Sequence, residues 1–372
     1  MTSTSTVAPY VVQSDQYFIE YFEFVRSFYF YVIPVMIVIL LIAIIGNGVI
    51  CISSRHLPSP VSPYLKLCVS LSAADLWAAT LLIIGLLVNS YLPVVIGVRK
   101  RSLCMDAVLE AFRVAAMLTS DWHLFALAVN QFVGTMWPLK YRMLVTTRRM
   151  RSLLFLLWIT PLFISFGWFL WWPEDGLRHP ECHFGFYNRF PFRAIVFVLF
   201  TAPLLATLVF YSLIVAHLMK AKAEFDSRSG RNESTISIHR VGVGKSVVAG
   251  KLKLVWTTLL ILLSFCLSWG LCVLYFVLVC SEGCLLTYKI SISPYVSLLF
   301  NSVVNCMVML KLASNPFIYT LRIRKFRQSV NSFIGKLKKA KAYHNTISQK
   351  ERRADQNGTL LSTKSNNLTF EY

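Results

Sequence analysis

Charged residues are scarce in this chain, and acidic residues are the scarcest. Only 15% of the 372 residues are charged, with 17 Asp and Glu against 37 Lys and Arg, while 56% are hydrophobic. A soluble globular domain normally carries about a quarter charged residues. The composition therefore argues against a water-soluble domain and favours a chain that lies largely in lipid.

Long apolar stretches recur seven times. Each is long enough to cross about 30 Å of hydrocarbon, which takes about 20 helical residues. The third is the least regular, because it is interrupted by Asp106, Glu110, Arg113 and Asp121. We predict an all-α membrane protein, a seven-transmembrane helix bundle. Its spans are expected near 28–53, 64–92, 105–137, 152–172, 192–219, 253–280 and 292–321.

The predicted bundle, residues 28–321, lies between two polar segments. Residues 1–27 are expected to form an extracellular N-terminal tail. Basic and apolar residues alternate at helical spacing over 322–335, which predicts a short amphipathic eighth helix on the membrane surface. Residues 336–372 are rich in Lys, Ser, Thr and Asn and are expected to form a flexible cytoplasmic tail.

A cleavable signal peptide is also missing, because the first 27 residues lack the required basic, apolar and small-residue pattern. Most Lys and Arg follow spans one, three, five and seven. The positive-inside rule then predicts a multi-pass plasma-membrane protein with its N terminus outside and its C terminus in the cytoplasm. The basic segments are expected to contact the anionic lipid bilayer, not nucleic acid.

Patterns of catalytic or metal-ligating residues are absent from the sequence. We therefore expect no enzyme, no cofactor and no metal site. Residues 242–246 resemble the end of a phosphate-binding loop, but His239 stands where that loop needs a glycine and no strand precedes it. A transporter would show internal repeats, and these spans show none.

The seventh stretch contains the most informative local feature. Pro316 follows Asn315 inside it, and a proline in a membrane helix removes a backbone donor and leaves a carbonyl that neighbours must satisfy. Lys311, Asn315 and Tyr319 recur every four residues, so an ammonium, an amide and a phenol share one helix face. Polar groups in a span indicate a functional site.

Residues in the other spans complete a pattern around this segment. They are Gly46-Asn47, Leu71 to Leu76, Asn130-Gln131-Phe132, Pro138 to Tyr141, Trp158, Pro203, Tyr211, Phe265, Trp269 and Phe326. In this order and at about this spacing, they resemble the rhodopsin-like (class A) G-protein-coupled receptors over essentially all seven spans. The resemblance implies a receptor for an extracellular ligand that acts through a heterotrimeric G protein, with arrestin as a further partner.

In that family a carboxylate, a serine and asparagines hold a sodium ion, and the resemblance assigns this site to Asp75, Ser120 and Asn315. Lys311 stands where the family usually has asparagine. A buried carboxylate needs a cation, donors or a proton. We hypothesise that the Lys311 ammonium replaces sodium and pairs with Asp75. The alternatives are a neutral Lys311 or a contact with Asp121.

The switch residues depart further from the family pattern. The acidic-Arg-aromatic triplet is Asn130-Gln131-Phe132 here, so the arginine that swings toward Tyr211 and the G protein is missing. Gln131 still donates hydrogen bonds, but uncharged ones are weaker. Either basal activity is raised or coupling is weakened, and a non-signalling receptor is the alternative. The resemblance gives the remaining switch roles to Phe265, Pro316 and Tyr319.

Two single positions narrow the prediction. Leu271 stands where the family's sixth span has a proline, and Gly270 beside it is expected to permit a bend instead. Met309 stands where a light-sensing relative needs a lysine, so retinal is not expected.

The predicted outer side holds two cysteine pairs and the ligand site. Cys104 and Cys182 lie in this oxidising environment and are expected to form a disulfide, and Cys280 and Cys284 can close on each other. Arg113 stands where amine receptors carry aspartate, which argues against a biogenic amine. It is expected either to bind an acidic ligand group or to pair with Glu110 one turn away.

The ligand itself is predicted from the loop after span four. This loop is aromatic and mixed in charge, and such a surface suits an extracellular peptide. A lipid is the alternative. The residues expected to bind the ligand are Glu110, Arg113, Phe184, Tyr187 and Trp269.

Overall fold

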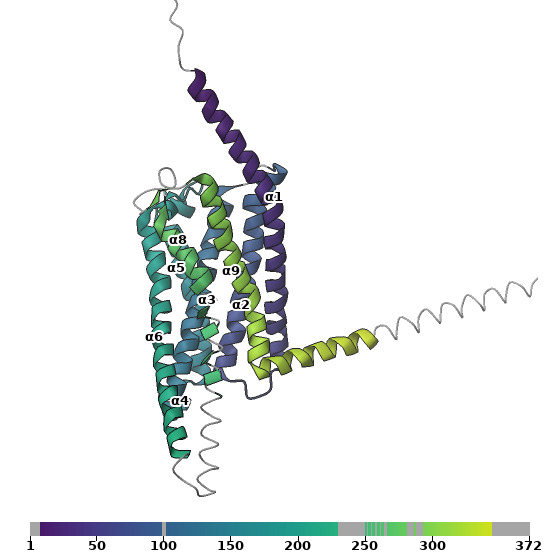
Figure 1. The fold of residues 1–372 in the computed structure, drawn as a ribbon, viewed down its shortest axis with the longest axis vertical. Helices are drawn as coiled ribbons and strands as arrows, with labels where there is room; N and C mark the ends of the chain where they lie inside the picture. Colours follow the sequence, from purple (N-terminus) through teal and green to yellow (C-terminus); the bar gives the residue numbers. More distant parts are fainter. Residues whose placement is uncertain are drawn as a thin grey trace, which may run out of the picture.

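The computed structural model is a bundle of long helices that accounts for all seven predicted spans (Figure 1). It describes residues 8–98, 102–229, 250, 252–253, 255–256, 259–260, 262–263, 266–280, 286–287 and 293–343. The helices of the first five spans are α1 (Ala8–Ser53), α2 (Pro63–Gly85) with the π-helical η2 (Leu86–Ile96), α3 (Leu103–Met136), α5 (Thr147–Trp171) and α6 (Phe190–Ser229).

The sixth and seventh spans complete the bundle. In the sixth, the described residues from 250 to 263 are helical and are followed by the π-helical η5 (Cys266–Gly270) and by α8 (Leu271–Leu278). The seventh is α9 (Pro294–Arg322). Shorter elements connect the spans: η1 (Ser54–His56), α4 (Pro138–Leu144), η3 (Gly176–Arg178), η4 (Gly185–Asn188), β1 (Val279–Cys280) and β2 (Leu286–Thr287). The two short strands pair in parallel and are a small exception to the all-α prediction.

Among the described residues, five helical stretches have the length and composition to cross a membrane: Gln16–His56, Pro63–Ile96, Thr147–Trp171, Phe190–Glu224 and Pro294–Leu321. Span three falls outside this set, in line with its charged residues. Its acids Asp106 and Asp121 are buried in the bundle, at 6% and 1% exposure. The charges that lower its hydropathy therefore include two that face protein and not lipid.

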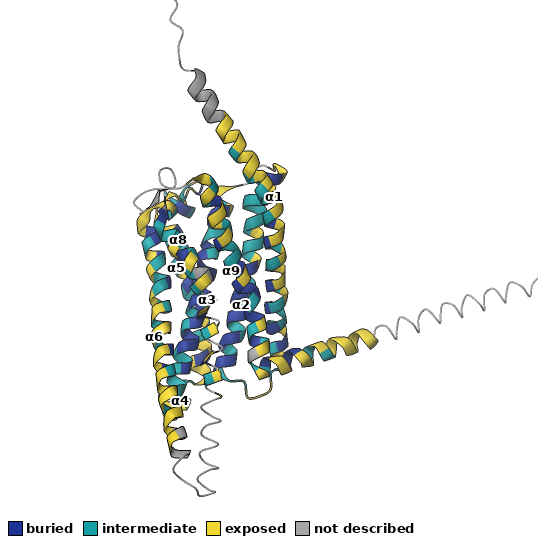
Figure 2. Cartoon of the chain, in the orientation of Figure 1, coloured by how far each residue is buried: buried dark blue, intermediate teal, exposed yellow. Residues whose placement is uncertain are grey.

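Burial follows the pattern of a protein in lipid (Figure 2). Large apolar side chains such as Ile45, Phe163 and Val198 are more than half exposed on the outer faces of their helices. Polar side chains such as Asn47, Asp75 and His123 are fully buried. The polar interior is therefore where a functional site is to be sought.

The first and last helices extend beyond the predictions. α1 begins at Ala8, twenty residues before the expected start of span one, and its 46 residues reach about 69 Å. Residues 324–343 are helical, beyond the predicted end at 335, because 336–343 contain no helix breaker. The two helices leave the bundle at opposite ends (Figure 1).

The eighth helix, residues 324–343, is fixed to spans one and seven. Phe326 is fully buried with its ring centroid 5.8 Å from that of Tyr319. The Ser329 hydroxyl donates to the backbone carbonyl of Ser53. The exposed Lys side chains of this helix lie mostly in its last turns, residues 336–343, all of which are exposed.

Candidate functional site

A buried polar cluster joins spans two, three and seven at the centre of the bundle. Lys311 Nζ lies 2.8 Å from Asp75 Oδ1 and 2.9 Å from Ser120 Oγ. The Ser120 hydroxyl donates to the same Asp75 oxygen at 3.1 Å. Asn315 Nδ2 donates to Asp75 Oδ2 at 2.5 Å. None of these four residues is more than 2% exposed. The structure therefore brings together all four residues that the sequence placed at the sodium site.

Lys311 takes the position of a cation in this cluster. Its ammonium and the Asp75 carboxylate form an ion pair with side-chain exposures of 1% and 0%. The second acid that the sequence offered, Asp121, is equally buried, but its Oδ2 accepts no hydrogen bond. A charge pair taken out of water is stable only when further hydrogen bonds satisfy its remaining lone pairs and protons, and Ser120 and Asn315 supply these.

Span one satisfies the carbonyl that Pro316 frees. A proline removes the hydrogen bond to the carbonyl four residues earlier, which is that of Leu312. Asn47 Nδ2 donates to this carbonyl at 2.9 Å, and to Ala43 O at 3.0 Å. A Cβ added to Gly46 would lie 3.0 Å from the Pro316 ring, so the missing side chain permits this close approach. The pair Gly46-Asn47 is thus explained by Pro316.

The residues of spans three and five that are predicted to form the switch lie at the end of the bundle that carries α4. Gln131 and Tyr211 are buried, at 6% and 1% exposure. Tyr211 packs in an apolar cluster with Val255 of span six, so spans five and six are closed against span three here. The Phe132 ring lies 4.9 Å from that of Phe210. Phe265 lies outside the described residues.

Beside these residues is an inner cavity of about 360 Å³. The Tyr141 hydroxyl of α4 donates to Asn130 Oδ1 at 2.9 Å along its wall. Gln131 reaches this cavity from span three. Its other lining residues are Ser62, Tyr64, Leu65, Gly134, Thr135, Val255, Ile323 and Lys325.

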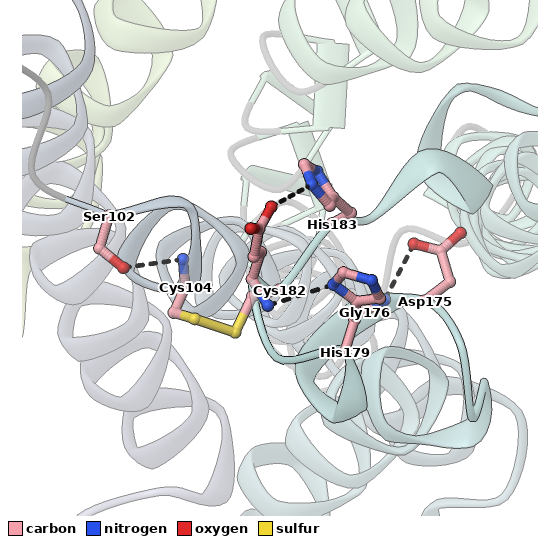
Figure 3. The surroundings of a disulfide bond; sticks show 8 residues. Ser102, Cys104, Asp175, Gly176, His179, Cys182 and His183 are labelled. Atoms are coloured by element: carbon pink, nitrogen blue, oxygen red, sulfur yellow. Dashed lines mark hydrogen bonds and ion pairs between the residues drawn. A yellow bond between two sulfur atoms is a disulfide. The ribbon is translucent and has the colours of Figure 1, made fainter.

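The disulfide between Cys104 and Cys182 is present, as predicted, and ties the loop after span four to the start of α3 (Figure 3). Asp175 organises the same loop, because its carboxylate accepts hydrogen bonds from the backbone N–H groups of Gly176, Gly185 and Phe186 at 2.8–2.9 Å. The proposed Cys280–Cys284 bridge lies outside the described residues, since Cys284 is not among them.

Arg113 is already engaged within the protein. Its Nε lies 2.9 and 3.1 Å from the two Glu110 oxygens, and Nη2 donates to the Tyr187 hydroxyl at 2.8 Å. The Tyr187 hydroxyl in turn donates to Glu110. Of the two alternatives that the sequence left open, the structure has the internal pair. Arg113 is therefore not a free anchor for an acidic ligand group.

An outer cavity of about 270 Å³ lies beside this trio. Of the residues predicted to bind the ligand, Arg113 and Tyr187 line this cavity, whereas Glu110 is not part of its wall and Phe184 packs against Phe169 and Tyr187. The side chain of Trp269 lies outside the described residues. The remaining lining residues are Val114, Met117, Asn188, Arg193, Val196, Cys272, Val273, Tyr275, Phe276, Ser297, Asn301 and Asn305.

Arg193 is a site residue that the sequence reasoning missed. It is 2% exposed and lines the outer cavity from the start of α6. Its guanidinium donates to the backbone carbonyls of Tyr187, Phe276 and Val279, and it lies 4.3 Å from the centroid of the Phe276 ring. It thus fastens span five to the end of span six. An arginine at the start of an apolar span was the available signal.

Comparison with known proteins agrees with this geometry. Residues 46–319 match the sequence family described as "7 transmembrane receptor (rhodopsin family)". The chain is 27% identical to human adenosine receptor A2a over 81% of its own length and 71% of the relative's. The canine adenosine receptor A2a is 26% identical over the same shares. Rat trace amine-associated receptor 3 is 28% identical over 46% of this chain and 49% of its own length.

Proposed function

The chain belongs to the rhodopsin family of seven-transmembrane receptors, and from this premise we propose that it carries an extracellular chemical signal to a heterotrimeric G protein. The end with the disulfide faces the outside, and the end with α4 and the eighth helix faces the cytoplasm. The distribution of Lys and Arg supports this orientation, because the basic segments follow the odd-numbered spans.

The observation that carries the proposal is the buried cluster of Asp75, Ser120, Lys311 and Asn315. It belongs to three spans and lies between an outer cavity that a ligand can enter and an inner cavity that reaches Gln131. Rearranging such a cluster changes how the spans pack at both ends. A polar cluster with two arrangements is a physical means of coupling distant sites.

The outer cavity favours a compact ligand. Its volume of about 270 Å³ lies just below the usual range of small-molecule sites, roughly 300–1,000 Å³. Amide groups of Asn188, Asn301 and Asn305 offer hydrogen bonds, and among the described residues beside the cavity two arginines outnumber one carboxylate, that of Glu110. The ligand we propose is therefore a small, neutral or anionic molecule rich in acceptors.

The relatives help to rank the ligand classes. Adenosine, named by two of them, is compact and neutral, whereas an amine would bring a positive charge to Arg113 and Arg193. A peptide, predicted from the loop after span four, is the second candidate. It would place only one side chain in a cavity of this size and rest on the aromatic loop that Asp175 and the disulfide hold.

Coupling without the family's arginine is the second part of the proposal. Gln131 lines the inner cavity, where it can hydrogen-bond an incoming G-protein segment but cannot form an ion pair. Position 130, where the family has an acid, is Asn, and its Oδ1 accepts from the Tyr141 hydroxyl. We propose weak coupling with measurable basal activity. Arrestin would enter the same inner cavity.

Nucleotide exchange on purified heterotrimers tests this function. The wild-type receptor and Gln131→Arg are reconstituted in lipid nanodiscs with G proteins of each class. We expect exchange above that of empty nanodiscs for the wild type, and a larger rate for Gln131→Arg. A silent wild type with a restored mutant supports the non-signalling alternative. Silence of both variants with every class contradicts coupling.

Ligand binding is tested separately by thermal stability. The wild type and Asn301→Leu are each mixed with adenosine, primary aryl amines, aromatic carboxylates or short acidic peptides. Asn301→Leu replaces one amide in the wall of the outer cavity by an apolar side chain. The proposal expects stabilisation by a neutral or anionic small molecule and its loss in Asn301→Leu. Stabilisation by the amines alone would contradict it.

A further inference from the structure

A third cavity, which shares Asn130 with the inner cavity, lies in the part of the bundle that faces lipid. We call it the α3–α5 groove. It has a volume of about 680 Å³ and is walled by α3 and α5, with Pro203 of α6 at one end and residues of α4 and the α4–α5 turn at the other. Apart from Asn130, Arg149 and Thr160, the lining side chains are hydrophobic. An apolar groove of this size within a bilayer is filled by something apolar.

The length of the groove matches one leaflet of the membrane. Along α3 it runs from Trp122 to Val133, and along the antiparallel α5 from Thr160 to Arg149. Each stretch rises roughly 16 Å at 1.5 Å per residue. Half of the hydrocarbon thickness is about 15 Å. An acyl chain that reaches the centre of the bilayer therefore fits along the groove with its headgroup at the Arg149 end.

The groove is positively charged at that end and nowhere else. Arg149 is exposed, and it is the one charged side chain among the lining residues. Its Nη1 donates to the last carbonyls of α4, those of Met143 and Leu144, at 3.2 Å each. Within the described part of the chain, no carboxylate pairs with it. The guanidinium is thus fixed at the mouth of the groove with donors to spare.

Asn130, on α3, is a second polar donor among the residues that line the groove. Its Oδ1 accepts from the Tyr141 hydroxyl, so its NH₂ is left to donate. Burial raises the pKa of Tyr141, which keeps this hydroxyl protonated. An acid at position 130 would instead place a negative charge at the mouth of the groove. Asn130 stands where the family has an acid in its switch triplet, so the mouth of the groove carries the positive charge of Arg149 without a negative charge from position 130.

We propose that the α3–α5 groove binds one anionic phospholipid of the inner leaflet, with an acyl chain between α3 and α5 and its headgroup on Arg149 and Asn130. The apolar groove is long enough for an acyl chain, and the single positive charge at its mouth favours a lipid with a negatively charged headgroup. This site is distinct from the outer ligand cavity and does not depend on the identity of the receptor's ligand.

Native mass spectrometry of the purified full-length receptor tests the proposal. It is incubated with phosphatidylserine or phosphatidylcholine of identical acyl chains. We expect one retained phosphatidylserine, preferred at least five-fold over phosphatidylcholine. Arg149→Gln removes the preference, and the matched charge loss Arg148→Gln, one residue away and outside the groove, leaves it unchanged. Asn130→Asp, which keeps the acceptor for Tyr141, lowers it as Arg149→Gln does.

Filling the groove separates a specific site from a basic surface. Ala126→Phe is expected to reduce retention of both lipids at least five-fold, and glycerophosphoserine without acyl chains is expected not to compete. A phosphatidylserine with a diazirine at the chain end should label α3 or α5 near Trp122 in the wild type, whether or not Ala126→Phe folds. Equal losses in Arg148→Gln and Arg149→Gln, competition by the free headgroup, or labelling elsewhere would each overturn the proposal.

Discussion

Replacing Lys311 is the sharpest perturbation that the buried cluster allows. Lys311→Met leaves the Asp75 carboxylate with hydrogen bonds from Ser120 and Asn315 but without a cation. Removing one partner of a fully buried ion pair costs about 3–5 kcal/mol. That is roughly a hundred-fold to a few thousand-fold in the folding equilibrium. Both charges lie at 1% exposure or less, so water cannot screen the loss.

The double variant Asp75→Asn, Lys311→Met tests whether this loss belongs to the pair. It removes both charges, and replacement of a buried pair by neutral groups is often close to neutral in stability. We expect the double variant to be more stable than Lys311→Met, by several kcal/mol. The measurement is the rate of irreversible thermal inactivation in nanodiscs at a fixed temperature.

Sodium provides the second arm of this test. In Lys311→Asn the carboxylate is left without its tethered cation, so a sodium ion can take its place. At a sodium concentration ten times its Kd, binding would stabilise this variant by about 1.4 kcal/mol. The wild type should not respond when sodium chloride replaces choline chloride at constant ionic strength. Equal responses of wild type and Lys311→Asn would refute the view that Lys311 stands in for sodium.

Three further substitutions test other parts of the structure. Gly176→Ala should strongly reduce folded receptor in a surface-expression assay, because its φ is +73° and a Cβ would clash with the backbone oxygen of Phe169; Gly167→Ala, with open space, is the control and should express normally. Asn47→Leu should lower thermal stability by about 1–3 kcal/mol, because the carbonyl of Leu312 loses its donor; an unchanged melting temperature would mean that water replaces the amide. Arg193→Lys should also lower the melting temperature, because one ammonium cannot reach the carbonyls that the guanidinium joins; a wild-type melting curve would argue against a fastening role.

The sequence predicts those parts of the fold that show as a pattern within one continuous segment. An apolar run of about 20 residues identifies a span wherever its neighbours lie. The ion pair of Lys311 and Asp75 belongs to the same class of inference, because two lone charges on facing spans have few other partners. The disulfide was expected because Cys104 and Cys182 are both predicted on the outer side, which also holds Cys280 and Cys284.

Other features depend on shape, which no single segment encodes. Arg193 donates to backbone carbonyls, which every residue has, so its partners cannot be recognised from the sequence. The α3–α5 groove exists because three helices fail to fill the space between them. Phe184 was expected at the ligand site because the loop after span four is rich in aromatic residues, but in the structure its side chain packs against Phe169. In these cases the sequence shows which side-chain type is present but not which way the side chain points in the fold.

The long first helix has a mechanical consequence. Its outer segment lies against the first turn of α9, where the rings of Tyr17, Tyr21 and Phe24 surround that of Tyr295 at centroid distances of 6.4, 5.2 and 4.9 Å. A helix transmits displacement along its axis far better than a loop does. The extended start of α1 is therefore packed directly on α9, the helix that carries Lys311, and a displacement of this segment would act on α9 first.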